Sequence, residues 1–531
     1  MRYLITFLCL LMPGAVLAIE VSGDVSGVWG PDNNPYEVVG DLRVPRESTL
    51  SIMPGCYIEF QGYYKFVVDS LATFSAVGTE ADSIVFTNED TLVGWHAIRL
   101  MWAGGVNELA YCRLQWGRAA GVSPNDTLTN GGAVYALGTS LSVSNCRFQF
   151  NRAWEGFGGC IYAEQSNLSV SNCVMEHNRS GWGGAAIYGL YSQVAITGST
   201  FAQDSTWYAL GGEVGGGAIG CVHSNVEITG NVISRNFCGM SGGGIMVRFS
   251  NSMIMGNVIS SNECWDFGGG IYARGPTIAA YNQLYGNYNF AYPFASGGGI
   301  ACGDSVTLIN NTIVGNYSGY AGGGIYTWAA APIDTFKNNI VWGNVAYFDS
   351  QIHLYLEEPS IVYNNIQGGW PGEGNIDADP LFAGPGDFHL TWANYPIEDS
   401  TKSPCIDTGD PSSPPDSDDT RADMGALFFD RRAQDIIEDP IPLPQAFILL
   451  QNYPNPFNYT TMVQFALPRT EHMSLSLFDV CGGKVAEIYD GVMEAGSHKL
   501  RITMQDVASG VYFLVLKTEK AQITRKMLLL K

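Results

Sequence analysis

The stretch GGGIYARGPTIAAYNQLYGN, residues 268–287, decides the fold, because its two marks return throughout the middle of the chain. The first mark is a glycine pair or triplet before a branched apolar residue, here Gly270-Ile271. The second is a branched or aromatic residue, two spacers and Asn, here Leu284 to Asn287. Copies of the first mark lie 25 to 32 residues apart, a period typical of solenoids. The branched residues of the first mark are Val134, Ile161, Ile187, Ile219, Ile245, Ile271, Ile300 and Ile325.

The repeat region has no helical periodicity. Its apolar runs are short, rich in β-branched residues and interrupted by Gly and Asn, as in short strands joined by turns. Two or three such strands cannot bury their apolar faces alone, but coils stacked at about 4.8 Å close a continuous core. We therefore predict an all-β chain built on a right-handed parallel β-helix.

The two marks resemble the GGA-I and F-x-x-N repeats of the polymorphic outer-membrane protein family, and the architecture resembles pectate-lyase-like solenoids. The resemblance covers residues 131–345. It implies the fold but not the function, because one solenoid can carry enzymes, adhesins or inert spacers.

The segments around the repeat have separate roles. Residues 19–130 contain short alternating stretches that we interpret as an N-terminal cap and the first coils, and residues 131–345 are the repeats. Residues 346–430 are expected to form the last coils and a C-terminal cap, and residues 431–446 a Pro-rich linker. Residues 447–531 form a further domain.

The N-terminus is typical of a secretory signal. Residues 1–18 combine Arg2, an apolar run over residues 4–11 and small residues before a cut at Ile19. A membrane anchor is the alternative, but the apolar run is too short to span and ends at Pro13-Gly14. We expect export, with no transmembrane segment after signal removal.

Residues 447–531 show several alternating strands separated by glycine turns, which predict a small immunoglobulin-like sandwich. The motifs LLQNYPNPFN (449–458), ASGVYF (508–513) and the ending KMLLLK (526–531) resemble the type A sorting domain of the bacterial type IX secretion system. This resemblance implies that the type IX secretion machinery is a partner. It also implies that the protein is secreted or attached to the outer surface of a Gram-negative bacterium.

This sorting domain departs from the family pattern at two positions. Tyr459 stands where the family often has Pro, and Gly483 where it often has Arg. Neither change affects the remaining motifs, which span the whole domain.

The formal net charge is −23, so a nucleic-acid partner is not expected, because its phosphates would be repelled.

One column of equivalent positions lies two residues before the branched residue of the second mark. Stacked Asn amides can hydrogen-bond from coil to coil, so we predict a structural ladder rather than a binding site. Asn365 is expected to continue the series. The predicted ladder residues are Asn231, Asn257, Asn282, Asn311 and Asn339.

A column of aromatic residues follows the second mark by three or four positions. Such rings either pack on each other and seal the turn, or stack on sugar faces along a groove. Charged neighbours favour the second use, because polar groups orient a glycan chain. The candidate glycan contacts are Trp154, Trp182, Trp207, Trp265, Arg152, Arg179, Glu213 and Asp266.

An acidic loop closes the solenoid region. Its carboxylates are either ligands for calcium, the one cofactor the sequence suggests, or a solvated acidic surface; their spacing does not match an EF-hand. The residues are Asp407, Asp410, Asp416, Asp418, Asp419 and Asp423.

Two functions remain open on the sequence. The first is a binding, adhesion or structural protein that contacts extracellular polysaccharide. The second is a polysaccharide-active enzyme, either a pectate-lyase-like lyase or a glycoside hydrolase, although the repeats show no convincing pair of catalytic carboxylates. A basic residue and two or more carboxylates converging on one outward face would favour the enzyme.

Overall fold

The structure is a computed structural model. It describes residues 18–120, 127–207, 214–291, 293–328, 335–356, 358–432, 447–449, 452, 455, 457, 460–493, 496–504, 507–518 and 521–529. The chain divides into two compact units, with the division between Phe429 and Asp430. The signal, most of the linker and Glu213 lie outside the described residues.

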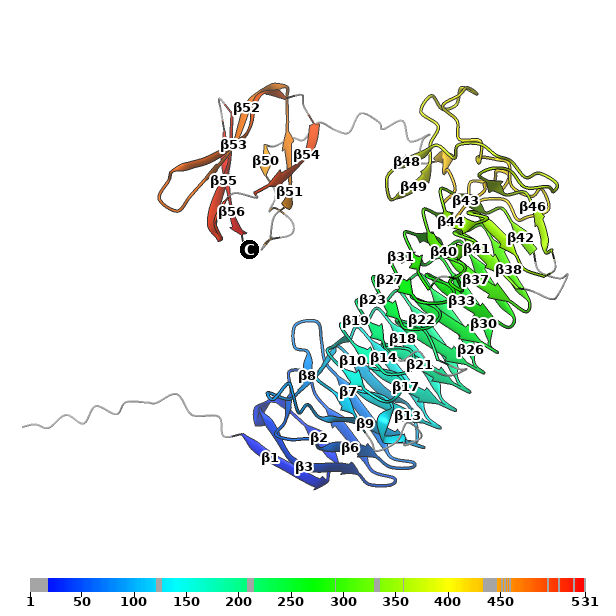
Figure 1. The fold of residues 1–531 in the computed structure, drawn as a ribbon. Helices are drawn as coiled ribbons and strands as arrows, with labels where there is room; N and C mark the ends of the chain where they lie inside the picture. The colour runs from blue at the N-terminus through cyan, green and yellow to red at the C-terminus, as the bar shows by residue number, and fades with distance from the viewer. Residues whose placement is uncertain are drawn as a thin grey trace, which may run out of the picture. The chain divides into compact units, whose positions relative to one another are not determined.

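One coil of the first unit shows how the repeat folds (Figure 1). The stretch quoted above forms β33 (Ile271–Arg274), β34 (Thr277–Ala280) and β35 (Gln283–Tyr285), and β36 (Tyr288–Asn289) follows. Ile271, Ala273 and Leu284 point inward and are buried. Each strand pairs in parallel with its equivalent in the next coil.

These pairings build long sheets. β34 belongs to a 13-stranded sheet and β36 to a nine-stranded one, while β33 and β35 belong to two series joined near the N-terminus into a 25-stranded sheet. The prediction of a parallel β-helix is therefore confirmed. Figure 1 shows the strands of successive coils stacked in the order of the chain.

The glycine mark is required by the close approach of neighbouring coils. A Cβ on Gly269 would lie 2.4 Å from the backbone oxygen of Gly298 in the next coil. Gly268 has a φ of +70°, which side chains with a Cβ rarely adopt. The glycines therefore turn the chain into β33 and let the backbones touch.

The predicted Asn column forms a hydrogen-bonded ladder. Asn257 Nδ2 donates to Asn282 Oδ1 at 2.9 Å and to Ile228 O at 2.8 Å, and its own Oδ1 accepts the backbone N–H of Asn231 at 2.9 Å. After Asn339 the ladder continues through Asn364, at 2.9 Å, so the assignment of Asn365 was wrong by one position.

A second ladder runs through the Asn of the second mark. In one rung, Asn262 Nδ2 donates to Asn287 Oδ1 at 3.0 Å and to Ile233 O at 2.9 Å. Each Asn thus satisfies backbone groups that the corner of the coil would otherwise bury without partners.

One rung of this second ladder is an acid. Asp204 is fully buried; its Oδ1 accepts from Asn178 Nδ2 at 3.0 Å, and its Oδ2 has no hydrogen-bond partner. In an Asn rung, the corresponding nitrogen donates a hydrogen. Burial raises the pKa of the Asp204 carboxyl well above its usual value, so the neutral form is favoured in the folded state.

The second unit is an antiparallel sandwich of a three-stranded and a four-stranded sheet, as predicted. The first sheet contains β50 (Ile448–Leu449), β51 (Thr460–Leu467) and β54 (Gly496–Thr503). The second contains β52 (Glu471–Phe478), β53 (Lys484–Met493), β55 (Gly510–Thr518) and β56 (Gln522–Leu529). Within the described residues of both units, no helix is long and apolar enough to cross a membrane.

We predict that Asp204→Asn stabilises the solenoid more strongly as the pH rises. The folded carboxyl has a raised pKa, so the stability that depends on its proton is present below about pH 4, the usual pKa of Asp, and is lost at higher pH. The amide carries hydrogens at every pH. Urea unfolding at pH 4, 6 and 8 should show the variant gaining about 1–3 kcal/mol at pH 8 and little at pH 4.

The matched control is Asp32→Asn, which changes an exposed carboxyl in the first coils. A difference between Asp204→Asn and the native chain that does not change with pH would contradict a protonated rung.

Candidate functional site

Aromatic side chains form a ridge beside the nine-stranded sheet. The second residue of β24 (Ser205–Thr206) and of β32 (Glu263–Cys264) is buried in the core. The residues that directly follow these strands, Trp207 and Trp265, are exposed. Phe290 holds the same position after β36. Because the strands are in register, these rings form a line along the solenoid axis.

The rings of this ridge touch each other without being buried. Trp265 lies 6.4 Å from both Phe237 and Phe290, with ring planes at 79° and 73°, and Tyr288 stacks on Tyr317 at 4.6 Å. Exposure is 56% for Trp207 and 40% for Trp265. Successive perpendicular rings present faces as well as edges to solvent. The rings therefore contact each other and also leave an open aromatic surface.

Trp182 does not belong to this ridge. It lies four residues after its Asn rather than three, so its register position is taken by Gly181. The indole is half-buried and donates from Nε1 to Glu155 O at 3.1 Å. Trp154 keeps the register, is 50% exposed and has the Arg152 guanidinium 4.8 Å from its ring centre.

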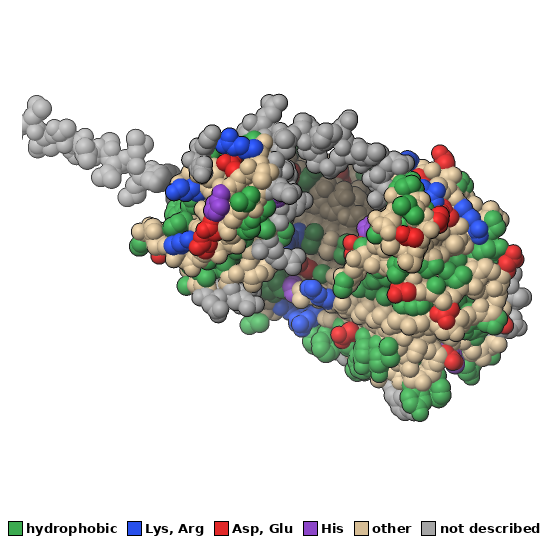
Figure 2. Space-filling view, turned by 90° about the horizontal axis from the view of Figure 1, so that it is seen from above, with side chains coloured by type: hydrophobic (Ala, Val, Ile, Leu, Met, Phe, Trp, Pro, Cys, Tyr) green, Lys and Arg blue, Asp and Glu red, His purple; other side chains and the backbone are tan. Residues whose placement is uncertain are grey.

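Three arginines form a column next to Trp154. Arg118, Arg152 and Arg179 occupy equivalent positions on consecutive parallel strands. Burial, and then the charges of Arg118 and Arg179, lower the pKa of the Arg152 guanidinium. Neither Arg152 nor Arg179 makes an ion pair with the described part of the chain. Figure 2 shows acidic and basic side chains among hydrophobic and uncharged ones on the visible face.

Asp266 lies apart from the arginine column, in a small cavity of about 180 Å³ behind the ridge. Arg248, Phe267 and Tyr272 share this cavity, and Arg248 Nε is buried without a hydrogen-bond partner. Burial raises the pKa of Asp266. The described lining thus holds one base and one carboxylate, which is fewer carboxylates than the enzymatic alternative requires.

The acidic loop forms a structural cap. Asp423 Oδ1 and Oδ2 accept the backbone N–H groups of Asp407 and Phe429, both at 2.7 Å, and Asp416 Oδ2 accepts that of Asp423 at 2.7 Å. Asp410 pairs with Lys337 of the solenoid at 3.1 Å.

Asp418 bonds the Thr420 hydroxyl, and the backbone N–H of Asp419 bonds Asp416 O. Within the described residues, no three His, Cys, Asp or Glu side chains could hold a metal ion. The structure therefore gives no support to the predicted calcium site, and the carboxylates of Asp410, Asp416 and Asp423 bind backbone and lysine groups.

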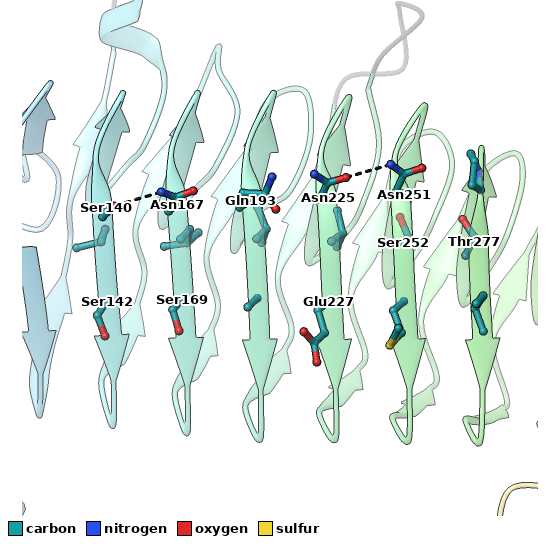
Figure 3. Close-up of a pocket in the computed structure, with 18 of the residues that line it drawn as sticks. Ser140, Ser142, Asn167, Ser169, Gln193, Asn225, Glu227, Asn251, Ser252 and Thr277 are labelled. Carbon is teal, nitrogen blue, oxygen red and sulfur yellow. Dashed lines mark hydrogen bonds between the residues drawn. The ribbon is translucent and has the colours of Figure 1, made fainter. Parts of the chain in front are cut away.

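A long groove, missed in the sequence, lies on the outer face of the 13-stranded sheet. Its volume is about 880 Å³, and it runs from Val106 to Thr307. Figure 3 shows amide side chains of successive strands pointing into it in one line. Asn251 Nδ2 donates to Asn225 Oδ1 at 3.1 Å, and Asn167 Nδ2 to Ser140 Oγ at 3.3 Å.

A repeated dipeptide could have revealed this groove. Four consecutive strands of the sheet begin with Asn or Gln, and a Ser precedes each of them. The Ser hydroxyls accept backbone N–H groups, for example Ser192 Oγ from Ser166 at 3.1 Å, and the following amides face solvent. The four pairs are Ser166-Asn167, Ser192-Gln193, Ser224-Asn225 and Ser250-Asn251.

Comparisons with known proteins bear on the two units differently. Residues 451–530 match the secretion system C-terminal sorting domain. No curated protein matches the chain. Among solved structures, the enzymatically active domain of tailspike protein 4 from bacteriophage CBA120 aligns at 10% identity over 91% of this chain, with a TM-score of 0.18. This chain covers 63% of the tailspike domain, and so low a TM-score is no evidence of a shared fold or function.

The match at residues 451–530 confirms the sequence resemblance. The second unit is therefore a sorting domain of the type IX secretion system, and the protein is exported and then released or held at the outer cell surface.

Proposed function

We propose that the solenoid is a binding module for extracellular glycans, and that the aromatic ridge with its arginine column is the contact surface. The observation that carries this proposal is the exposure of the ridge, where Trp207, Trp265 and Phe290 are each 39–56% exposed. Large exposed aromatic surfaces mark interaction sites on soluble proteins.

Ring faces suit sugars because the C–H face of a pyranose is flat and apolar. The ridge offers them along one line, from Trp207 through Phe237 and Trp265 to Phe290. A linear chain parallel to the solenoid axis can therefore contact several rings at once, and each contact adds to its affinity.

The arginine column favours a glycan with acidic groups. Arg152 and Arg179 occupy equivalent positions on neighbouring parallel strands, so their like charges repel each other. A carboxylate or sulfate bound between them removes the repulsion and makes charge-assisted hydrogen bonds.

Binding fits the described residues better than catalysis. Arg248 and Asp266 share the small cavity behind the ridge, but its described lining offers a lyase or hydrolase only one carboxylate. The enzymatic alternative therefore has no observation of its own in the described part of the chain.

Replacing two rings of the ridge should weaken glycan binding. We predict that Trp207→Ala combined with Trp265→Ala lowers affinity for acidic polysaccharides such as alginate or chondroitin sulfate about tenfold, because two ring contacts are lost. Isothermal titration of the full chain measures this. Tyr355→Ala, which removes a ring that is 65% exposed elsewhere, is the control and should bind normally.

The arginine column is tested in the same titration. Arg152→Gln with Arg179→Gln should reduce both the affinity and its dependence on salt, whereas Arg46→Gln on the exposed surface should change neither. The proposal would be abandoned if the native chain bound no polysaccharide of the panel, or if the double ring variant bound equally well.

Delivery can be tested independently of binding. Deleting residues 447–531 should leave the solenoid folded, because its core is separate from that of the sandwich, and should leave the protein in the periplasm. Cell fractionation with circular dichroism of the retained protein measures both. Truncated protein at the cell surface or in the medium would contradict the role of the sorting domain.

A further inference from the structure

We propose that the groove on the outer face of the 13-stranded sheet is a second binding site, which takes a neutral linear polysaccharide lying across the strands. This site is distinct from the aromatic ridge and does not depend on it. It begins near β10 (Asn107–Ala110) and ends near β38 (Val306–Ile309), with a volume of about 880 Å³.

The spacing of the coils suits a repeating ligand. Neighbouring parallel strands lie about 4.8 Å apart, which is close to the advance of one sugar unit in an extended chain. Each coil can therefore offer similar groups to each successive sugar. An open groove of this volume has room for several sugars, within the range of known ligand sites.

The floor of the groove carries paired donors and acceptors. Asn167, Gln193, Asn225 and Asn251 are in register on four consecutive strands, and all four side chains are exposed. Figure 3 shows them pointing to the same side of the sheet. An amide has two donor hydrogens and an acceptor oxygen, so each keeps hydrogen-bonding capacity for sugar hydroxyls after its contact with a neighbour.

Stacked rings lie beside the row of amides, outside the residues that line the groove. Tyr191, His223 and Phe249 occupy the same corner of three successive coils, two residues before the amides, with ring centres 5.1 and 5.2 Å apart. The ring planes are within 14° of parallel, so the three rings make a continuous aromatic wall beside the amides. The C–H groups of a sugar chain lying on the amides can pack against this wall.

The charge of the groove selects a neutral ligand. Glu227 is the one charged side chain among the described residues that line it, so no base is present to hold a carboxylate or sulfate. The strand backbone groups are already paired with neighbouring coils, which argues against the addition of a peptide strand to this face. A polymer of uncharged hydroxyl-bearing units fits both constraints.

A blocking substitution tests the site without disturbing the core. Ala195 lies on the floor in β22 (Gln193–Thr197), and Thr197 lies on the same strand and face but outside the groove. We expect Ala195→Arg to lower affinity for linear neutral polysaccharides, tested as β-glucan, mannan and galactan, at least about tenfold. Thr197→Arg should bind as the native chain does.

A second variant removes part of the wall instead of filling the floor. Tyr191→Ala should weaken the same neutral polysaccharides and leave alginate binding unchanged, and Trp207→Ala with Trp265→Ala should do the reverse. If alginate binds but no neutral polysaccharide does, the groove proposal fails and the ridge proposal stands. If Ala195→Arg leaves neutral binding intact, the groove proposal fails as well.

A second copy of the chain is the competing occupant. Sedimentation velocity measures whether the native chain and Ala195→Arg are monomers or dimers, and so tests this alternative. A native dimer that Ala195→Arg dissociates would overturn the polysaccharide proposal in favour of self-association, and a monomer in both cases supports it.

Discussion

Every coil of the solenoid must bury backbone N–H groups at its corners, and the rest of the structure depends on how these groups find acceptors. Side chains of the next coil supply them. The backbone N–H of Asn231 bonds Asn257 Oδ1 at 2.9 Å, and that of Ser199 bonds Asn231 Oδ1 at 2.8 Å. Cysteine serves at the N-terminal end, where the N–H of Cys112 points to Cys146 Sγ at 3.3 Å. The column therefore tolerates different residue types as long as each presents an acceptor.

Constant stacking has a functional consequence. Because the ladders hold neighbouring coils in register, side chains that point outward repeat along lines parallel to the axis. The aromatic ridge and the arginine column are two such lines along the nine-stranded sheet, and the amide row is a third along the 13-stranded sheet. A surface of this kind matches ligands that are themselves linear repeats, which is the physical link between the fold and the proposed glycans.

Most of the fold could be predicted because its signals repeat. The glycine mark reports a backbone contact that excludes a Cβ, as at Gly269, and the Asn marks report hydrogen bonds between equivalent positions. The sorting domain could be recognised because its motifs span its whole length. Single-residue register is harder to predict, and Asn365 was confused with its neighbour Asn364, which carries the ladder bond.

The candidate site could be predicted only in part, because exposure depends on turns whose length varies. Trp207 and Trp265 emerge on the ridge, but one extra residue in its turn places Trp182 against Glu155. Arg248 could not be identified from the sequence, since its cavity is lined by residues of three successive coils. The acidic loop resembled a metal site in composition, yet Asp423 is used to hold backbone groups. Composition does not distinguish a carboxylate that binds a cation from one that closes a turn.

The central claim is that the ladder amides hold the coils together, and Asn257→Leu tests it most directly. Asn257 is fully buried, and leucine of similar size would leave the N–H of Asn231 and the oxygen of Ile228 without partners. Urea unfolding should show a loss of at least about 1–3 kcal/mol. Asn251→Leu on the outer face of the same coil should cost little. Equal stability of Asn257→Leu and the native chain would contradict the account.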